Sequence, residues 1–151
     1  LVSVLVLFLL ASCGYTPMYS NKVNLDFSIL SLEIDGNNDI NNIIESKLNR
    51  YFDIESSRKY KIKINTSYKK ISAAKDTTGN TTNFKLSTSL NLDYEIIDPK
   101  KEKQNKSISF SESFIIKRNE NNYEQNNYEK IIIKNMSELM IERMILYLSR
   151  K

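Results

Sequence analysis

The chain has 151 residues, of which 40% are hydrophobic and 26% charged, and its formal net charge is +4. This length and composition fit one ordinary globular domain and argue against a disordered chain. The sequence has no histidine, one cysteine and three glycines. It therefore lacks the commonest general base and metal ligand, cannot close an internal disulfide, and has no glycine-rich phosphate loop. No serine or carboxylate pair stands in a catalytic context, so we expect no enzyme, no metal site and no cofactor.

The first residues carry a targeting signal. Residues 1–12 form an uncharged apolar run, LVSVLVLFLLAS. The run is too short to span a bilayer, which needs about 20 residues, but it has the length of the hydrophobic region of a signal peptide. No basic segment precedes it and the chain opens on Leu1 rather than Met, so we expect the natural start to lie upstream. These features predict a signal peptide at 1–12, a tether at 13–24 and a single folded domain at 25–151.

The apolar run ends in Leu10-Ala11-Ser12-Cys13, which resembles the lipobox of bacterial lipoprotein precursors. In that class, the cysteine thiol receives a diacylglycerol, the bond before it is cleaved, and the new amino group is acylated. The resemblance implies that Cys13 is the lipid attachment site and that acyl chains such as palmitate anchor the chain to a membrane. Gly14 stands where an aspartate would imply retention at the inner membrane, so we expect the outer membrane, with the domain facing the periplasm. The alternative is a buried free cysteine.

Hydrophobic periodicity predicts the elements of the mature chain. The expected order is a strand at 25–34, a helix capped by Asp39 and running to Phe52, strands at 59–71, 84–96 and 108–116, and a helix from Tyr123 or Tyr128 to Leu148. A change of phase within 25–34 indicates a bulge or burial on both faces, and the small polar residues at 72–83 indicate a loop. Three consecutive strands favour hairpins. The predicted fold is α+β, in the order β-α-β-β-β-α, with two helices on one face of a four-stranded, mainly antiparallel sheet.

Alternation also assigns the two faces of the sheet. Apolar residues such as Tyr60, Ile62 and Leu90 are expected to face the helices. The opposite face is expected to be polar, with Ser87, Ser89, Asn91, Ser109 and Ser111 among its residues. The final helix is expected to bury an apolar stripe, namely Ile132, Met136, Leu139, Met140, Met144 and Tyr147.

Several segments together resemble one known family. Residues 13–19 (CGYTPMY) are similar to its lipidated start, and the final helix at 136–148 (MSELMIERMILYL) is similar to its closing stretch. The strand that begins at Thr82-Asn83-Phe84 and closes at 94–98 (YEIID), and the order of the elements, fit the same pattern. The family is that of the LPS-assembly lipoprotein LptE, in its alphaproteobacterial form.

This resemblance implies that the chain partners the outer-membrane barrel LptD. Members of the family sit inside the barrel as a plug, help it assemble, and help deliver lipopolysaccharide to the outer leaflet. Large outer-membrane barrels have polar interiors, and the polar sheet face expected above could contact such an interior. The modest net charge does not favour a nucleic-acid partner. The alternative is an unrelated periplasm-facing lipoprotein that binds another envelope protein or peptidoglycan.

Lipopolysaccharide carries phosphates, for which lysine and arginine are the natural contacts. The local candidates are Lys59, Lys61 and Lys63 on one face of a strand, with Lys85 expected nearby on the next strand. The alternative is a solvated strand face, on which lysine discourages edge-to-edge aggregation.

Overall fold

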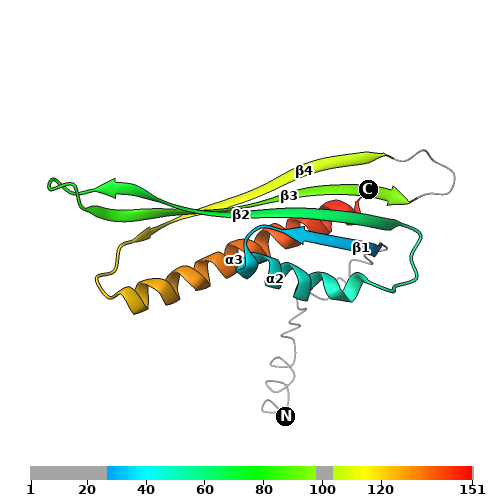
Figure 1. Cartoon of the computed structure of the whole chain (residues 1–151), viewed down its shortest axis with the longest axis horizontal. Helices are drawn as coiled ribbons and strands as arrows, with labels where there is room; N and C mark the ends of the chain where they lie inside the picture. Colours follow the sequence, from blue (N-terminus) through cyan, green and yellow to red (C-terminus); the bar gives the residue numbers. More distant parts are fainter. Residues whose placement is uncertain (1–26, 98–103, 151) are drawn as a thin grey trace, which may run out of the picture.

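A four-stranded sheet lies over two helices in the computed structural model, which describes residues 27–97 and 104–150 (Figure 1). The elements are β1 (Ser28–Asp35), α2 (Asn38–Leu48) with a 3-10 turn η2 (Asn49–Tyr51), β2 (Lys59–Lys75), β3 (Thr81–Ile97), β4 (Asn105–Lys117) and α3 (Asn122–Ser149). The strand order is β1-β2-β3-β4. β1 runs parallel to β2, whereas β2 with β3 and β3 with β4 are antiparallel. The predicted α+β fold and its element order are confirmed, and the mixed sheet is mainly antiparallel.

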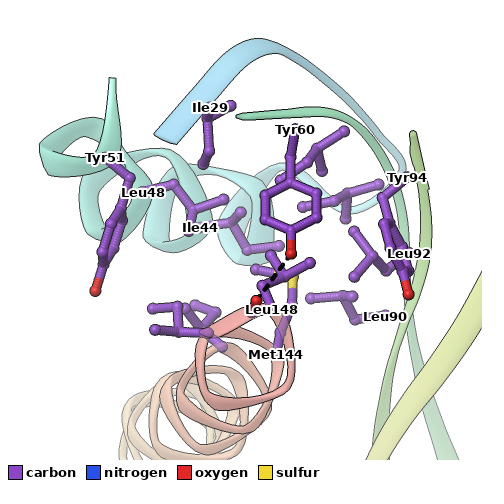
Figure 2. Close-up of a cluster of buried hydrophobic side chains, with 14 of the residues drawn as sticks. Ile29, Ile44, Leu48, Tyr51, Tyr60, Leu90, Leu92, Tyr94, Met144 and Leu148 are labelled. Carbon is purple, nitrogen blue, oxygen red and sulfur yellow. Dashed lines mark hydrogen bonds between the residues drawn. The ribbon is translucent and has the colours of Figure 1, made fainter. Parts of the chain in front are cut away.

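The main core lies between the sheet and the two helices. Tyr60, Ile62 and Ile64 of β2 are buried, and the lysines that alternate with them are exposed. Leu90 and Leu92 of β3 meet them from the next strand, as Figure 2 shows for this cluster. The alternation of apolar and polar residues therefore predicted correctly which side of β2 and β3 faces the helices, because every second side chain of a strand points the same way.

The β2–β3 hairpin is longer than predicted. The segment 72–83 is not a loop, because β2 continues to Lys75 and β3 starts at Thr81. Only residues 76–80 form the turn, in which the Asp76 carboxylate accepts hydrogen bonds from the backbone N–H groups of Thr78 and Asn80. The hairpin end projects beyond the start of α3 (Figure 1). Its polar residues gave no alternation because neither face is buried there, while backbone pairing alone maintains the strands.

β1 and α2 follow the prediction with shifted ends. The change of phase in β1 corresponds to a bulge between Ile29 and Ser31. The α2 cap is Asn37 rather than Asp39, since the Asn37 side chain accepts a hydrogen bond of 3.1 Å from the N–H of Ile40. The α-helix ends at Leu48, because the next residues form the 3-10 turn instead.

A tight turn joins β1 to α2. Gly36 has φ +109°, and a Cβ on it would lie 2.0 Å from the backbone oxygen of Thr66. The Thr66 hydroxyl accepts from the N–H of Asn37 at 2.9 Å and donates to Oδ1 of Asn41 at 2.6 Å. Glycine is therefore required sterically here, and Thr66 fixes the start of α2 against β2.

α3 starts at the earlier of its two predicted positions, with Asn121 as the cap. Leu139 of the predicted stripe is 40% exposed, so that assignment is wrong. The helix twists across the sheet and also packs on α2, which buries residues on two flanks: Met136, Met140, Ile141, Met144, Ile145 and Leu148. Its last carbonyls are satisfied from β2 and the loop before it, where Tyr60 Oη donates to the Leu148 oxygen at 3.0 Å and Arg58 Nη1 to the Ser149 oxygen at 2.8 Å. Neither described helix is long and apolar enough to cross a membrane.

Candidate functional site

The outer face of the sheet, which we define as the side turned away from the helices, carries rows of short polar side chains. Ser67, Ser89 and Ser111 are cross-strand neighbours in one row. In the next row, Asn91 lies between Asn65 and Ser109. The Oγ atoms of Ser67 and Ser89 are 2.7 Å apart, and Ser109 Oγ donates to Oδ1 of Asn91 at 2.7 Å.

These side chains offer donors and acceptors on short stems. A polar wall can therefore approach the outer face closely and hydrogen-bond to it directly or through water. The polar character predicted for Ser87, Ser89, Asn91, Ser109 and Ser111 is confirmed by their position on this face.

Three of the predicted lysines lie together at one end of the outer face, but among carboxylates. Lys63 is a cross-strand neighbour of both Glu33 and Asp93, and its Nζ is 3.5 Å from an oxygen of Glu33. Lys61 faces Glu95 in the same way. These residues line a shallow concavity of about 480 Å³. The positive charge of the lysines is balanced locally, so an anion would have to displace a carboxylate to reach either one.

Lys85 does not join this group. The register places it between Ile71 of β2 and Ile115 of β4. That row is eight positions along β2 from Lys63, or about 26 Å at the rise of a strand. The expectation that Lys85 lies near the other three lysines is therefore wrong, because the antiparallel register could not be read from the sequence.

Lys85 instead belongs to a second concavity of about 500 Å³ on the outer face, together with Lys69. Lys69 is opposite Ser87, two residues from Lys85. Neither lysine makes an ion pair within residues 27–97 and 104–150. Glu112 also lines this concavity, but its carboxylate contacts Arg143, so the charge of the lysine pair is less compensated than that of Lys61 and Lys63.

A polar network that was not predicted from the sequence lies on the helix side of the same end of the sheet. Glu129 of α3 is 8% exposed and contacts the ammonium group of Lys70. Gln125 donates to the same carboxylate oxygen at 2.6 Å and accepts from the N–H of Asn119 at 2.6 Å. The Lys70 ammonium also lies 4.3 Å from the centre of the Phe84 ring.

This network ties the first turns of α3 to the projecting hairpin. Beside it, the hydroxyl of Tyr68 is buried and has no hydrogen-bond partner among residues 27–97 and 104–150. Burial raises the pKa of Tyr68, and the negative charge of Glu129 raises it further. The only trace in the sequence is that two adjacent lysines, Lys69 and Lys70, interrupt the alternation of β2, so that one must turn inward.

A chain of aromatic rings crosses the other end of the core. Tyr60, Tyr94 and Tyr147 meet edge to face, with ring centres 5.8 Å and 5.9 Å apart. The hydroxyls of Tyr94 and Tyr147 are 3.0 Å apart. Burial raises the pKa of Tyr60, and burial followed by the hydrogen bond with Tyr147 raises that of Tyr94. Tyr60 and Tyr94 are therefore neutral structural groups at physiological pH.

The predicted lipid attachment site, Cys13, and the tether at 13–24 lie outside the described residues. In the described ranges, no group of three or more histidine, cysteine, aspartate or glutamate residues is placed to hold a metal ion. The geometry thus offers surfaces for binding: a hydrogen-bonding outer face with a pair of lysines toward one end.

No family model and no curated protein matches the sequence. Among solved structures, the chain is similar to rare lipoprotein B from Shewanella oneidensis, with a TM-score of 0.52 and 12% identity over 80% of this chain and 94% of that one. It is also similar to a minor lipoprotein from Acinetobacter baumannii, with a TM-score of 0.50 and 10% identity over 83% and 92% of the two chains. At these identities, the likeness establishes a shared fold.

Proposed function

We propose that this chain is a lipid-anchored protein of the bacterial outer membrane, attached through Cys13. In this proposal it partners a large barrel of the LptD type in the assembly and transport of lipopolysaccharide, as plug and assembly factor. The observation that carries the proposal is the fold shared with two bacterial lipoproteins, each matched over more than nine-tenths of its length. The lipobox-like segment ending at Cys13 supports the anchor independently.

The outer face supports the barrel as partner. The interior of a large outer-membrane barrel is polar, and a plug must match it without an apolar belt. The rows through Ser89 and Asn91 provide such a surface over three neighbouring strands. Serine and asparagine lose little side-chain entropy on contact compared with lysine or glutamate, which favours a closely fitted polar interface.

The proposed contacts with lipopolysaccharide phosphates involve Lys59, Lys61, Lys63 and Lys85. Among them, Lys59 and Lys85 have no carboxylate as a cross-strand neighbour and no ion pair with a described residue, whereas Lys61 and Lys63 face carboxylates. Lys63 must exchange Glu33 for a phosphate. Since both groups are solvent-exposed, their ion pair contributes at most about 1 kcal/mol and such an exchange is feasible.

The anchor and the partner are tested in one purification. The full chain is tagged at its C-terminus, produced in its native cells, and purified from detergent extract. We expect mass spectrometry to find a mature chain that starts at an acylated Cys13, together with a large outer-membrane barrel in stoichiometric amount. An uncut, unacylated chain would overturn the anchor, and co-purification of peptidoglycan or a different envelope protein would favour the alternative lipoprotein function.

A pair of variants tests whether the outer face is the barrel contact. We expect Ser89→Arg with Ser111→Arg to abolish recovery of the barrel, because two long cations are then placed in adjacent positions of a closely packed row. The control is Asn42→Arg, which adds a cation at an exposed position of α2 on the helix side. Equal recovery of the barrel with both proteins would exclude the outer face.

The two groups of lysines are tested separately for binding of purified lipopolysaccharide. Lys85→Ala should weaken binding more than Lys61→Ala with Lys63→Ala, since the latter two lysines already face carboxylates. Binding that is unchanged in the triple variant would remove all three residues from the proposed contact.

A further inference from the structure

The free edge of β4 offers a place for another strand. In the part of the chain that the structure describes, β4 pairs with β3 on one side only. It has 13 residues and pairs without a bulge, which makes it about twice as long as a typical strand. An edge of this kind leaves a row of backbone N–H and C=O groups available for pairing with a further strand.

One flank of α3 lies beside the inner side of this edge. Arg143, Leu146, Tyr147 and Arg150 follow one another at helical spacing and share that flank. Together with Phe110 of β4 they line a groove of about 490 Å³. The Phe110 and Tyr147 rings meet edge to face at 6.2 Å, and Leu146 is 41% exposed. The floor of the groove is therefore apolar.

Two further exposed apolar side chains lie beyond the groove, toward the C-terminal end of β4. Strand and helix run antiparallel, as their contacts show: Glu112 with Arg143, and Phe110 with Tyr147. By this direction, Phe114 of β4 and Leu139 of α3 both lie on the far side of the Glu112–Arg143 contact from the groove. Phe114 is 46% exposed and Leu139 is 40% exposed. Large apolar side chains gathered along a free strand edge indicate a binding surface rather than scattered surface residues.

The charge of the groove is positive. Arg143 contacts the carboxylate of Glu112, but Arg150 makes no ion pair with a described residue. A guanidinium group binds a carboxylate through paired hydrogen bonds. An occupant that carries a carboxylate at this point complements the groove, whereas a lysine there is repelled.

We propose that the β4 edge and this flank of α3 form a docking site for an extended segment of a partner protein. The segment adds to the sheet as a fifth strand, with its backbone paired to β4. Its side chains alternate, so those on one side enter the groove about 6.6 Å apart. Apolar side chains contact Phe110 and Leu146, and one carboxylate pairs with Arg150. This is recognition by strand addition, in which backbone pairing gives affinity and alternate side chains give specificity.

The proposal uses the inner side and edge of β4, whereas the barrel contact proposed above uses the outer face. The two are therefore independent, and the failure of one leaves the other intact. A second copy of β4 would also present a carboxylate, Glu112, but that carboxylate already contacts Arg143 of its own chain, which favours a segment of a different protein.

The test uses the full chain in non-ionic detergent and a capped eight-residue probe, Thr-Leu-Thr-Glu-Thr-Leu-Thr-Leu. We expect the probe to slow amide hydrogen exchange in β4 but not in β1, as measured by mass spectrometry. A probe with the same side chains and every backbone nitrogen methylated should not bind, because it has no N–H group left to pair on either of its edges. Replacing the probe's Glu by Lys should weaken binding.

A charge exchange identifies the arginine. We expect Arg150→Glu to weaken binding of the original probe, which contains Glu, by roughly three- to tenfold. The same variant should strengthen binding of the probe in which Lys replaces Glu by a similar factor. The control is Lys134→Glu, the same charge change on the flank of α3 that faces α2, which should alter neither affinity. Circular dichroism verifies the helix content of both variants.

Three results would overturn the proposal. The first is an absence of added protection in β4 at saturating probe. The second is equal binding of the N-methylated probe, which would mean that the edge is not paired. The third is protection of β4 that increases with protein concentration alone, which would assign the edge to a second copy of the chain.

Discussion

Replacing Leu90 by aspartate tests the central assignment of the fold. Leu90 is fully buried between the sheet and the helices and lies opposite Thr66 and Phe110 on the inner face. Loss of a buried leucine side chain costs about 2–5 kcal/mol. Burial of a carboxylate or carboxylic acid without a designed partner adds about 1–3 kcal/mol. The sum is comparable to the whole stability of a domain, about 5–15 kcal/mol, so we expect Leu90→Asp to be largely unfolded.

The assay is urea unfolding of the full chain in non-ionic detergent, followed by circular dichroism. Leu90→Ala should fall between the natural chain and Leu90→Asp. The control is Asn91→Asp, which introduces the same side chain one residue later on the exposed outer face and should change stability by about 0.5 kcal/mol or less. Equal midpoints for Leu90→Asp and Asn91→Asp would refute the division of β3 into a buried and an exposed face.

Three further outcomes follow from local geometry. Gly36→Ala should lower the free energy of unfolding by about 2 kcal/mol or more, since it combines a strained φ with a clash against the Thr66 backbone. Gly79→Ala has a similar φ but open space around the new Cβ and should lower it less; equal losses of stability in the two variants would show that the clash at Gly36 is relieved. Tyr68→Phe should leave the free energy of unfolding unchanged or raise it by up to about 1 kcal/mol, because the buried hydroxyl has no hydrogen-bond partner among the described residues; a clear loss of stability would reveal a partner. Stability should fall above about pH 10, because tyrosines ionise there in the unfolded chain while burial keeps the pKa of Tyr94 raised in the folded one. In Tyr94→Phe the urea midpoint should fall less steeply between pH 9 and 11, and an equally steep fall would show that Tyr94 is not the cause.

The sequence predicted the fold well where one face of an element is buried and the other is not. Tyr60 and Leu90 alternate with polar neighbours, so the strand, its inner face and its place over the helices could all be inferred. The change of phase in β1 even located the bulge beside Ile29. In each case the physical cause is local: burial on one side imposes period 2 on the residues.

The pattern failed where burial is absent or occurs on two sides. The end of the β2–β3 hairpin is exposed on both faces, so its strands left no alternation and 72–83 resembled a loop. α3 packs on both the sheet and α2, so its apolar residues surround the helix and Leu139 could not be told from a buried residue. The pairing of Lys70 with Glu129 spans 59 positions, so the adjacent lysines at 69 and 70 show that one turns inward but do not identify its partner.

The same limit governs the candidate site. A run such as Lys59, Lys61 and Lys63 shows which face the charges share, but the charges that oppose them are set by strand register. Register places Glu33, Asp93 and Glu95 against two of these lysines. It places Lys85 among uncharged neighbours at the other end of the sheet. Since a lysine in high dielectric attracts an anion only as far as nearby carboxylates leave its charge uncompensated, we expect Lys69 and Lys85 to attract an anion more strongly than Lys61 and Lys63.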